Sequence, residues 1–174
     1  MNIINSQEEA NKYFDEKEYL YNIPNKYITQ EMVDIYFSKY NALLDIPEEY
    51  ITQEMANIQF KKHKTLYLIP EEFITKSMVE EYWNLNENLV FIPEKFITKD
   101  MVDKYFSKYN SIVGIPKKYI TKDMVSKYWN KYETLYEIPE EFITQSMVNI
   151  YMNNNDDLSF IPEKYISDNM ISKK

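Results

Sequence analysis

The segment IPEEFITKSMVEEYWNLNENLVF, residues 69–91, decides the fold, because its pattern returns along the chain every 23 residues. Each of the seven prolines follows an isoleucine, and each lies 23 residues after the one before it. Such a fixed period is the signature of a repeat architecture. The repeats are 23–45, 46–68, 69–91, 92–114, 115–137 and 138–160, with a degenerate segment 1–22 before them and a truncated one, 161–174, after them. We number the positions of a repeat from 1 at its isoleucine to 23.

Within each repeat, the pattern predicts a short helical turn followed by a longer helix. Proline at position 2 suits the first residue of a helix, because its missing N–H is not needed there. Apolar residues at positions 10, 11, 14 and 15 lie on one face of a helix. Position 7 is expected to cap that helix at its amino end. Its residues are Thr29, Thr52, Thr75, Thr98, Thr121, Thr144 and Ser167.

Asparagine is expected to end four of these helices in a left-handed conformation, because the chain has a single glycine to serve that purpose. The residues concerned are Asn41, Asn86, Asn110 and Asn155. Methionine at position 10 and the aromatic rings at positions 5, 14 and 15 are interpreted as core, with the tyrosine hydroxyls at its edge.

One repeat is too small to bury its own apolar face, so neighbouring repeats must cover it. The sequence therefore predicts an all-α fold, an α-solenoid of tandem 23-residue repeats forming a single domain over residues 1–174. Asn5 and Glu9 replace the isoleucine and methionine of other repeats, as the polar face of a terminal cap requires. Residues 1–22 are accordingly expected to cap the amino-terminal end.

The composition excludes several classes of site. The chain has no cysteine, one histidine (His63), one glycine (Gly114) and no arginine, its 20 basic residues all being lysine. Cysteine-based metal centres and disulfides are thus absent, and glycine-rich phosphate loops cannot form. His63 is interpreted as a partly buried, hydrogen-bonded side chain. We expect no enzymatic activity, no catalytic or metal site and no cofactor.

The net charge of −8 disfavours binding to nucleic acid or to an anionic membrane. No stretch of the sequence has the length and apolar character of a membrane span, and the amino terminus lacks the features of a secretory signal. We expect the protein to be cytoplasmic, in its organism or in an infected host cell.

The positions that vary between repeats point to a surface for a partner. Positions 13 and 17 share one edge of the helix, here called the helix flank, where isoleucine alternates with charged residues. Residues 94–131 carry nine lysines and four acids, which suits a partner with an acidic patch. The predicted partner-binding residues are Ile35, Lys39, Ile58, Lys62, Leu85, Lys104, Lys108, Tyr109, Lys127, Lys131, Tyr132 and Ile150.

The segment LYEIPEEFITQSMV, residues 135–148, and its equivalents resemble a known class of short helical repeats. Members of that class carry a Leu-x-x-(Ala/Ile)-Pro-x-x-(aromatic or Leu) segment, followed by a helix with paired apolar residues. They occur in giant DNA viruses, protists and amoeba-associated bacteria and have no established activity. The resemblance implies an α-solenoid and a viral or parasite origin.

Three functions remain open at this point. The first is a non-enzymatic scaffold that binds another protein along one face of the solenoid. The second is structural self-assembly, as a dimer or filament formed through the truncated segment 161–174. The third is an acidic mimic of nucleic acid, which the 20 interspersed lysines disfavour.

Overall fold

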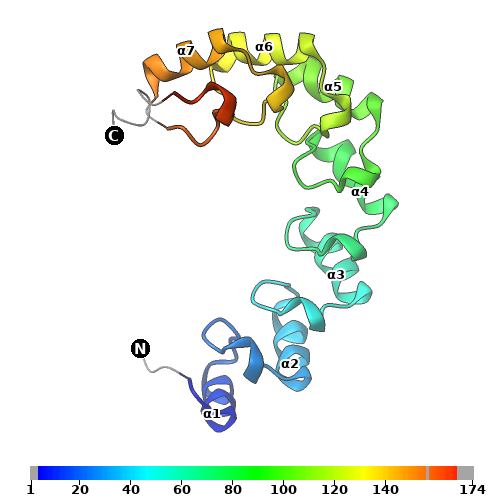
Figure 1. Ribbon diagram of the computed structural model, residues 1–174. Coiled ribbons are helices and arrows are strands. Elements are labelled where there is room, and N and C mark those ends of the chain that lie inside the picture. Colours follow the sequence, from blue (N-terminus) through cyan, green and yellow to red (C-terminus); the bar gives the residue numbers. More distant parts are fainter. Residues whose placement is uncertain (1–3, 156, 168–174) are drawn as a thin grey trace. The chain divides into compact units, whose positions relative to one another are not determined.

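The computed structural model describes residues 4–155 and 157–167, and in this part of the chain all regular secondary structure is helical, without strands (Figure 1). α-Helices alternate with short 3₁₀ helices, one of each per repeat. The α-helices are α1 (Gln7–Lys17), α2 (Gln30–Tyr40), α3 (Gln53–His63), α4 (Lys76–Asn86), α5 (Lys99–Tyr109), α6 (Lys122–Tyr132) and α7 (Gln145–Asn154). The 3₁₀ helices are Asn25–Tyr27, Glu48–Tyr50, Glu71–Phe73, Glu94–Phe96, Lys117–Tyr119, Glu140–Phe142 and Glu163–Tyr165. The predicted all-α fold of tandem 23-residue repeats is confirmed.

The chain divides into two compact units, which we call the first half (Met1–Asn86) and the second half (Glu87–Lys174). Each is described by itself. The single repeat domain over residues 1–174 therefore stays a prediction.

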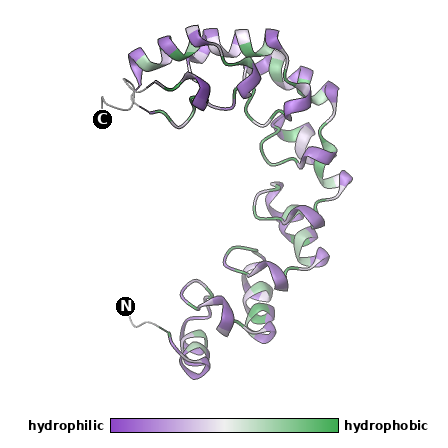
Figure 2. Cartoon of the chain, viewed as in Figure 1, coloured by the Kyte–Doolittle hydropathy of each residue, from purple (hydrophilic) through white to green (hydrophobic). Residues whose placement is uncertain are grey.

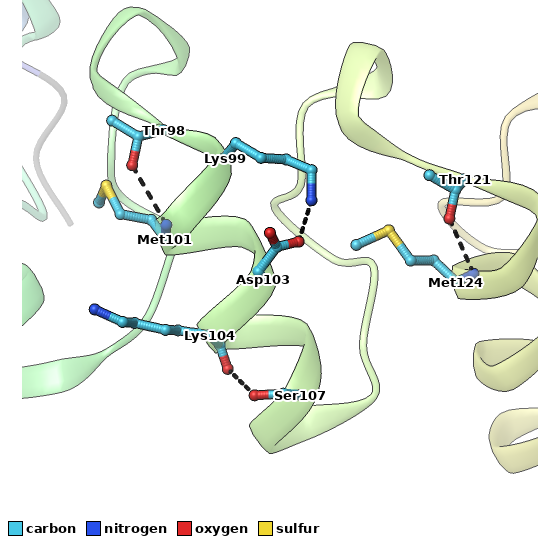
Figure 3. Close-up of polar contacts among 8 residues, drawn as sticks. All are labelled: Thr98, Lys99, Met101, Asp103, Lys104, Ser107, Thr121 and Met124. Carbon is cyan, nitrogen blue, oxygen red and sulfur yellow. Dashed lines mark hydrogen bonds and ion pairs between the residues drawn. The ribbon is translucent and has the colours of Figure 1, made fainter.

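The predicted threonine caps are present from α2 to α7, and Ser6, at the equivalent position of residues 1–22, caps α1 in the same way. In every one of these helices, the hydroxyl of the residue at position 7 accepts a hydrogen bond from the backbone N–H three residues later, at 3.2–3.3 Å. Figure 3 shows two of these bonds, from Met101 to Thr98 and from Met124 to Thr121. Each bond satisfies a backbone donor that the helix itself leaves without an acceptor. The helix expected after Ser167 lies outside the described residues.

The predicted asparagine caps are half right. Asn41 and Asn110 adopt the left-handed conformation, with φ of 48° and 49°. Asn86 is instead the last residue of α4, where Glu87 takes the left-handed φ of 47°, and Asn155 is extended. The prediction fails because Asn86 and Asn155 stand at position 18, whereas the left-handed residue that ends each of α1 to α6 stands at position 19. Each of their side-chain amides donates to the carbonyl four residues earlier, at 2.9 and 3.0 Å.

The sequence suggested that proline occupies the first helical position, but in the structure it lies one residue before the 3₁₀ helix. Pro24 has φ −56° and ψ 136°, so it is extended and lies immediately before the 3₁₀ helix Asn25–Tyr27. Its carbonyl accepts the first hydrogen bond of that turn, from the N–H of Tyr27, at 2.8 Å. The fixed φ of proline is compatible with this extended geometry as well as with a helix.

A second left-handed residue occurs at position 23 of four repeats. Asp45, Leu68, Gly114 and Glu137 have φ between 63° and 78°, in the turn that leads into the next Ile-Pro pair. The chain's one glycine therefore stands where a glycine is favoured. A Cβ added to Gly114 would lie 3.4 Å from the backbone of Val90, in the preceding repeat.

The core consists of the residues that the periodicity selects, and Figure 2 shows each helix with hydrophilic and hydrophobic sides. The largest fully buried side chains are leucine or isoleucine at position 21 and valine at position 11. Methionine at position 10 is buried in five repeats, as predicted, at Met32, Met55, Met78, Met101 and Met124. Met147 is half-buried, and Met170 lies outside the described residues.

Hydrogen bonds from the position-5 tyrosines join adjacent repeats. The hydroxyl of Tyr50 donates to the carbonyl of Ile28 at 2.8 Å, and that of Tyr165 donates to the carbonyl of Ile143 at 2.9 Å. Tyr119 makes the equivalent bond at 3.4 Å. These rings are half-buried with the hydroxyl at the edge of the core, as the sequence predicts.

Candidate protein-binding surface

The apolar residues of the helix flank lie at the surface. Ile35 is 42% exposed, Leu85 61% and Ile150 39%, whereas Ile58 is half-buried. All four project from α-helices whose caps hold the backbone in place. Branched aliphatic side chains exposed on an otherwise polar flank are available to a partner.

The lysines at position 17 join successive repeats. The ammonium group of Lys62 donates to the carbonyl of Tyr40 at 2.7 Å, and that of Lys131 donates to the carbonyl of Tyr109 at 2.8 Å. Both carbonyls belong to the last residue of the preceding α-helix, where backbone acceptors lack intrahelical donors and the helix dipole favours a cation. These two lysines thus cap the helix before their own.

Two other lysines of position 17 reach the preceding repeat through a carboxylate. Lys39 forms an ion pair with Glu18, and Lys108 forms one with Glu87. The shared hydrogen bond raises the pKa of Lys108 above its ordinary value and lowers the pKa of Glu87. Both acids stand at position 19, so the same register of stacking brings each pair together.

Lys104 and Lys127 are different, because their ion pairs stay within one helix. Lys104 contacts Asp100 at 2.9 Å and Lys127 contacts Asp123 at 2.8 Å, each one turn earlier. Such exposed pairs contribute only about 0.3–0.5 kcal/mol. Figure 3 shows the side chain of Lys104 extending away from the Lys99–Asp103 ion pair on the other side of α5.

The two tyrosines of the prediction lie at the ends of α5 and α6. Tyr109 is half-buried, and its ring centroid is 5.0 Å from that of Tyr105. Tyr132 is 44% exposed, and its hydroxyl donates to the carbonyl of Tyr109 at 3.3 Å. Tyr132 is therefore the more accessible of the two.

Two equivalent grooves lie beside the flank in the first half. The first groove, about 440 Å³, runs between α1 and α2. It is lined by Gln7, Asn11, Phe14, Asp15, Thr29, Gln30, Glu31, Met32 and Ile35. The second groove, about 270 Å³, runs between α2 and α3. It is lined by Gln30, Asp34, Phe37, Ser38, Thr52, Glu54, Met55 and Ile58.

The sequence reasoning missed a second row of exposed apolar residues, at position 22 in the turn after each helix. Tyr21 is 70% exposed, and Leu44, Tyr67, Val90 and Tyr136 are between 45% and 56% exposed. The signal was present, since position 22 is apolar in the six copies from Tyr21 to Tyr136. The helical period selects positions on the helices and carries no information about the turns, so it does not identify this row.

His63 is exposed at the end of α3, so its predicted burial is wrong. The residues that the structure describes contain no group of three histidine, cysteine or acidic side chains that could hold a metal ion. Within residues 4–155 and 157–167, no helix has the length and apolar character that a membrane span requires.

Comparison of the chain with family models, curated proteins and solved structures finds no match. The resemblance to the short helical repeats of giant viruses and protists therefore stays a prediction.

Proposed function

We propose that this chain is a non-enzymatic scaffold that binds another protein along the helix flank. The observation that carries the proposal is the exposure of Ile35, Leu85 and Ile150. The buried core uses other positions of the repeat, and position 13 holds isoleucine, glutamate or lysine in α2 to α6, each of which has 11 residues. Folding therefore does not require an apolar side chain at position 13. Contact with the apolar surface of a partner accounts for the exposed isoleucines there.

Lysines of the second half support a partner with an acidic patch at this flank. Lys104 and Lys127 are exposed, and their ion pairs with Asp100 and Asp123 on the same helix are weak. Carboxylates of a partner can replace those contacts at little cost. Lys108 and Lys131 are less available, because they already hold the preceding repeat.

The test is recovery of partners by the full chain from the native cell, with Lys127→Glu and Lys122→Glu as a matched pair. Both lysines are exposed on α6, but Lys122 stands at position 8, away from the flank. We expect Lys127→Glu to lose a specific partner that Lys122→Glu retains. Equal recovery by the two variants would contradict the proposal, and Ile150→Ser tests the apolar part in the same way.

A further inference from the structure

We infer that the two grooves of the first half bind a basic, extended protein segment that carries an apolar side chain at every third residue. This inference rests on the proposed function, since Ile35 and Ile58 of the helix flank line the two grooves. It adds the chemistry of the partner, which the proposed function leaves unstated for this half.

The apolar part of each groove is built from the same repeat positions. Phe14 and Met32 form the buried floor of the first groove, and the exposed Ile35 forms its wall. Phe37, Met55 and Ile58 take the same places in the second groove. One apolar side chain of a partner therefore fits each groove, in equivalent surroundings.

The polar part of both grooves is acidic. Asp15 and Glu31 line the first groove, Asp34 and Glu54 line the second, and all four are exposed. None of the residues lining either groove is a lysine. Gln30, which lines both grooves, donates its amide hydrogen to Asp34 at 2.8 Å, so one carboxylate is already oriented. Lysine or arginine side chains between the apolar anchors complement this charge.

The spacing of the grooves selects the conformation of the segment. Packed helices lie about 8–10 Å apart, so the two grooves repeat at about that interval. A polyproline II segment rises about 3.1 Å per residue with three residues per turn, which returns a side chain to the same face after about 9.3 Å. A β-strand alternates its faces at every residue and would turn the second anchor away.

The equivalent positions of α6 and α7 provide an internal comparison. There the rim positions hold Lys122, Ser126, Asn130 and Ser146, with no carboxylate among them, although Ile150 is present. The second half therefore has the apolar side chain without the acidic rim. We therefore expect a basic segment to bind the grooves of the first half and not the equivalent region between α6 and α7.

The experiment measures fluorescence anisotropy of a labelled peptide, four copies of Leu-Lys-Pro, with the full chain. Proline favours the polyproline II conformation in the peptide and in the residue before it. One control peptide has glutamate in place of lysine, and another has one extra lysine between successive leucines, which breaks the spacing. Circular dichroism of each variant shows that it is folded.

We expect the Leu-Lys-Pro peptide to bind at least about tenfold more tightly than either control peptide. Ile35→Ser combined with Ile58→Ser should weaken binding about tenfold or more, as is typical of central apolar anchors. Glu31→Gln combined with Glu54→Gln should weaken it severalfold and reduce its dependence on salt. Leu44→Ser, at an exposed apolar residue that lines neither groove, should leave it unchanged.

Equal binding of the three peptides, or equal binding to the Ile35→Ser/Ile58→Ser and Leu44→Ser variants, would overturn the inference. A failure of all three peptides to bind would overturn it as well. These outcomes would leave the proposed function standing, because its test does not involve the acidic grooves. That test asks whether a native partner is lost by Lys127→Glu and retained by Lys122→Glu.

Discussion

The substitution Gln59→Met should stabilise the protein, because Gln59 is a polar residue in a buried apolar position. It lies on α3 at position 14, it is 4% exposed, and its side-chain oxygen Oε1 has no hydrogen-bond donor. The same position holds tyrosine in the other full repeats, at Tyr36, Tyr82, Tyr105, Tyr128 and Tyr151. A buried acceptor without a partner costs about 1–3 kcal/mol. Methionine has a similar shape and no comparable desolvation cost, so we expect a gain of about that size.

The assay is urea unfolding followed by far-ultraviolet circular dichroism. The midpoint should rise with an unchanged slope, because the surface exposed on unfolding stays the same. The melting temperature should rise by about 2–4 °C for each kcal/mol gained. Because neighbouring repeats unfold as coupled units, hydrogen exchange should slow most in α3 and the helices beside it.

Gln145→Met is the matched control, since Gln145 is an exposed glutamine at the start of α7. Its effect should stay within about 0.5 kcal/mol. An unchanged or lower midpoint for Gln59→Met would refute the reasoning, because it would mean that Oε1 finds a hydrogen bond in solution.

Three further predictions concern caps, turns and pH. Thr121→Ala removes the acceptor for the N–H of Met124 and should lower the unfolding free energy by about 1 kcal/mol, so an unchanged urea midpoint would contradict it. Glu133 and Gly114 both have a left-handed backbone conformation, which favours glycine. In the same assay Glu133→Gly should therefore raise the unfolding free energy by about 0.5–1 kcal/mol, and Gly114→Ala should lower it by about 1–2 kcal/mol. Changes of the same sign in the two variants would contradict this prediction. Burial raises the pKa of Tyr128 to about 12, so the unfolded state loses this proton first and stability should fall between pH 10 and pH 12. Tyr128→Phe should make that fall shallower, and an equally steep fall would count against burial as its cause.

The sequence was sufficient for the features that each repeat determines locally. The threonine caps depend on residues three apart, and the buried face depends on the helical period, so both follow from the chain alone. The failures arose where a single position decides the outcome. Asn86 and Asn155 stand at position 18 and are not left-handed, and composition alone does not distinguish position 18 from position 19.

The flank residues could be found from the sequence, but the contacts of their lysines could not. Lys62 and Lys131 reach carbonyls 22 residues earlier, which depends on how far one repeat is offset from the next. The grooves were missed for the same reason, because their walls come from two helices. Period and propensity describe one repeat at a time and do not fix that offset.

In the proposed function, the lysines of position 17 and the isoleucines of position 13 have different roles on the helix flank. At position 17, Lys39, Lys62, Lys108 and Lys131 each contact the preceding repeat, whereas Leu85 at the same position is exposed. Position 13 makes no such contact through Ile35 or Ile150, which remain exposed. Residues beside position 13 can therefore change from acidic in the first half to neutral or basic between α6 and α7 without disturbing the stack. We propose that the rims of the two grooves of the first half set the specificity for a partner there, while the core positions of the repeat stay constant.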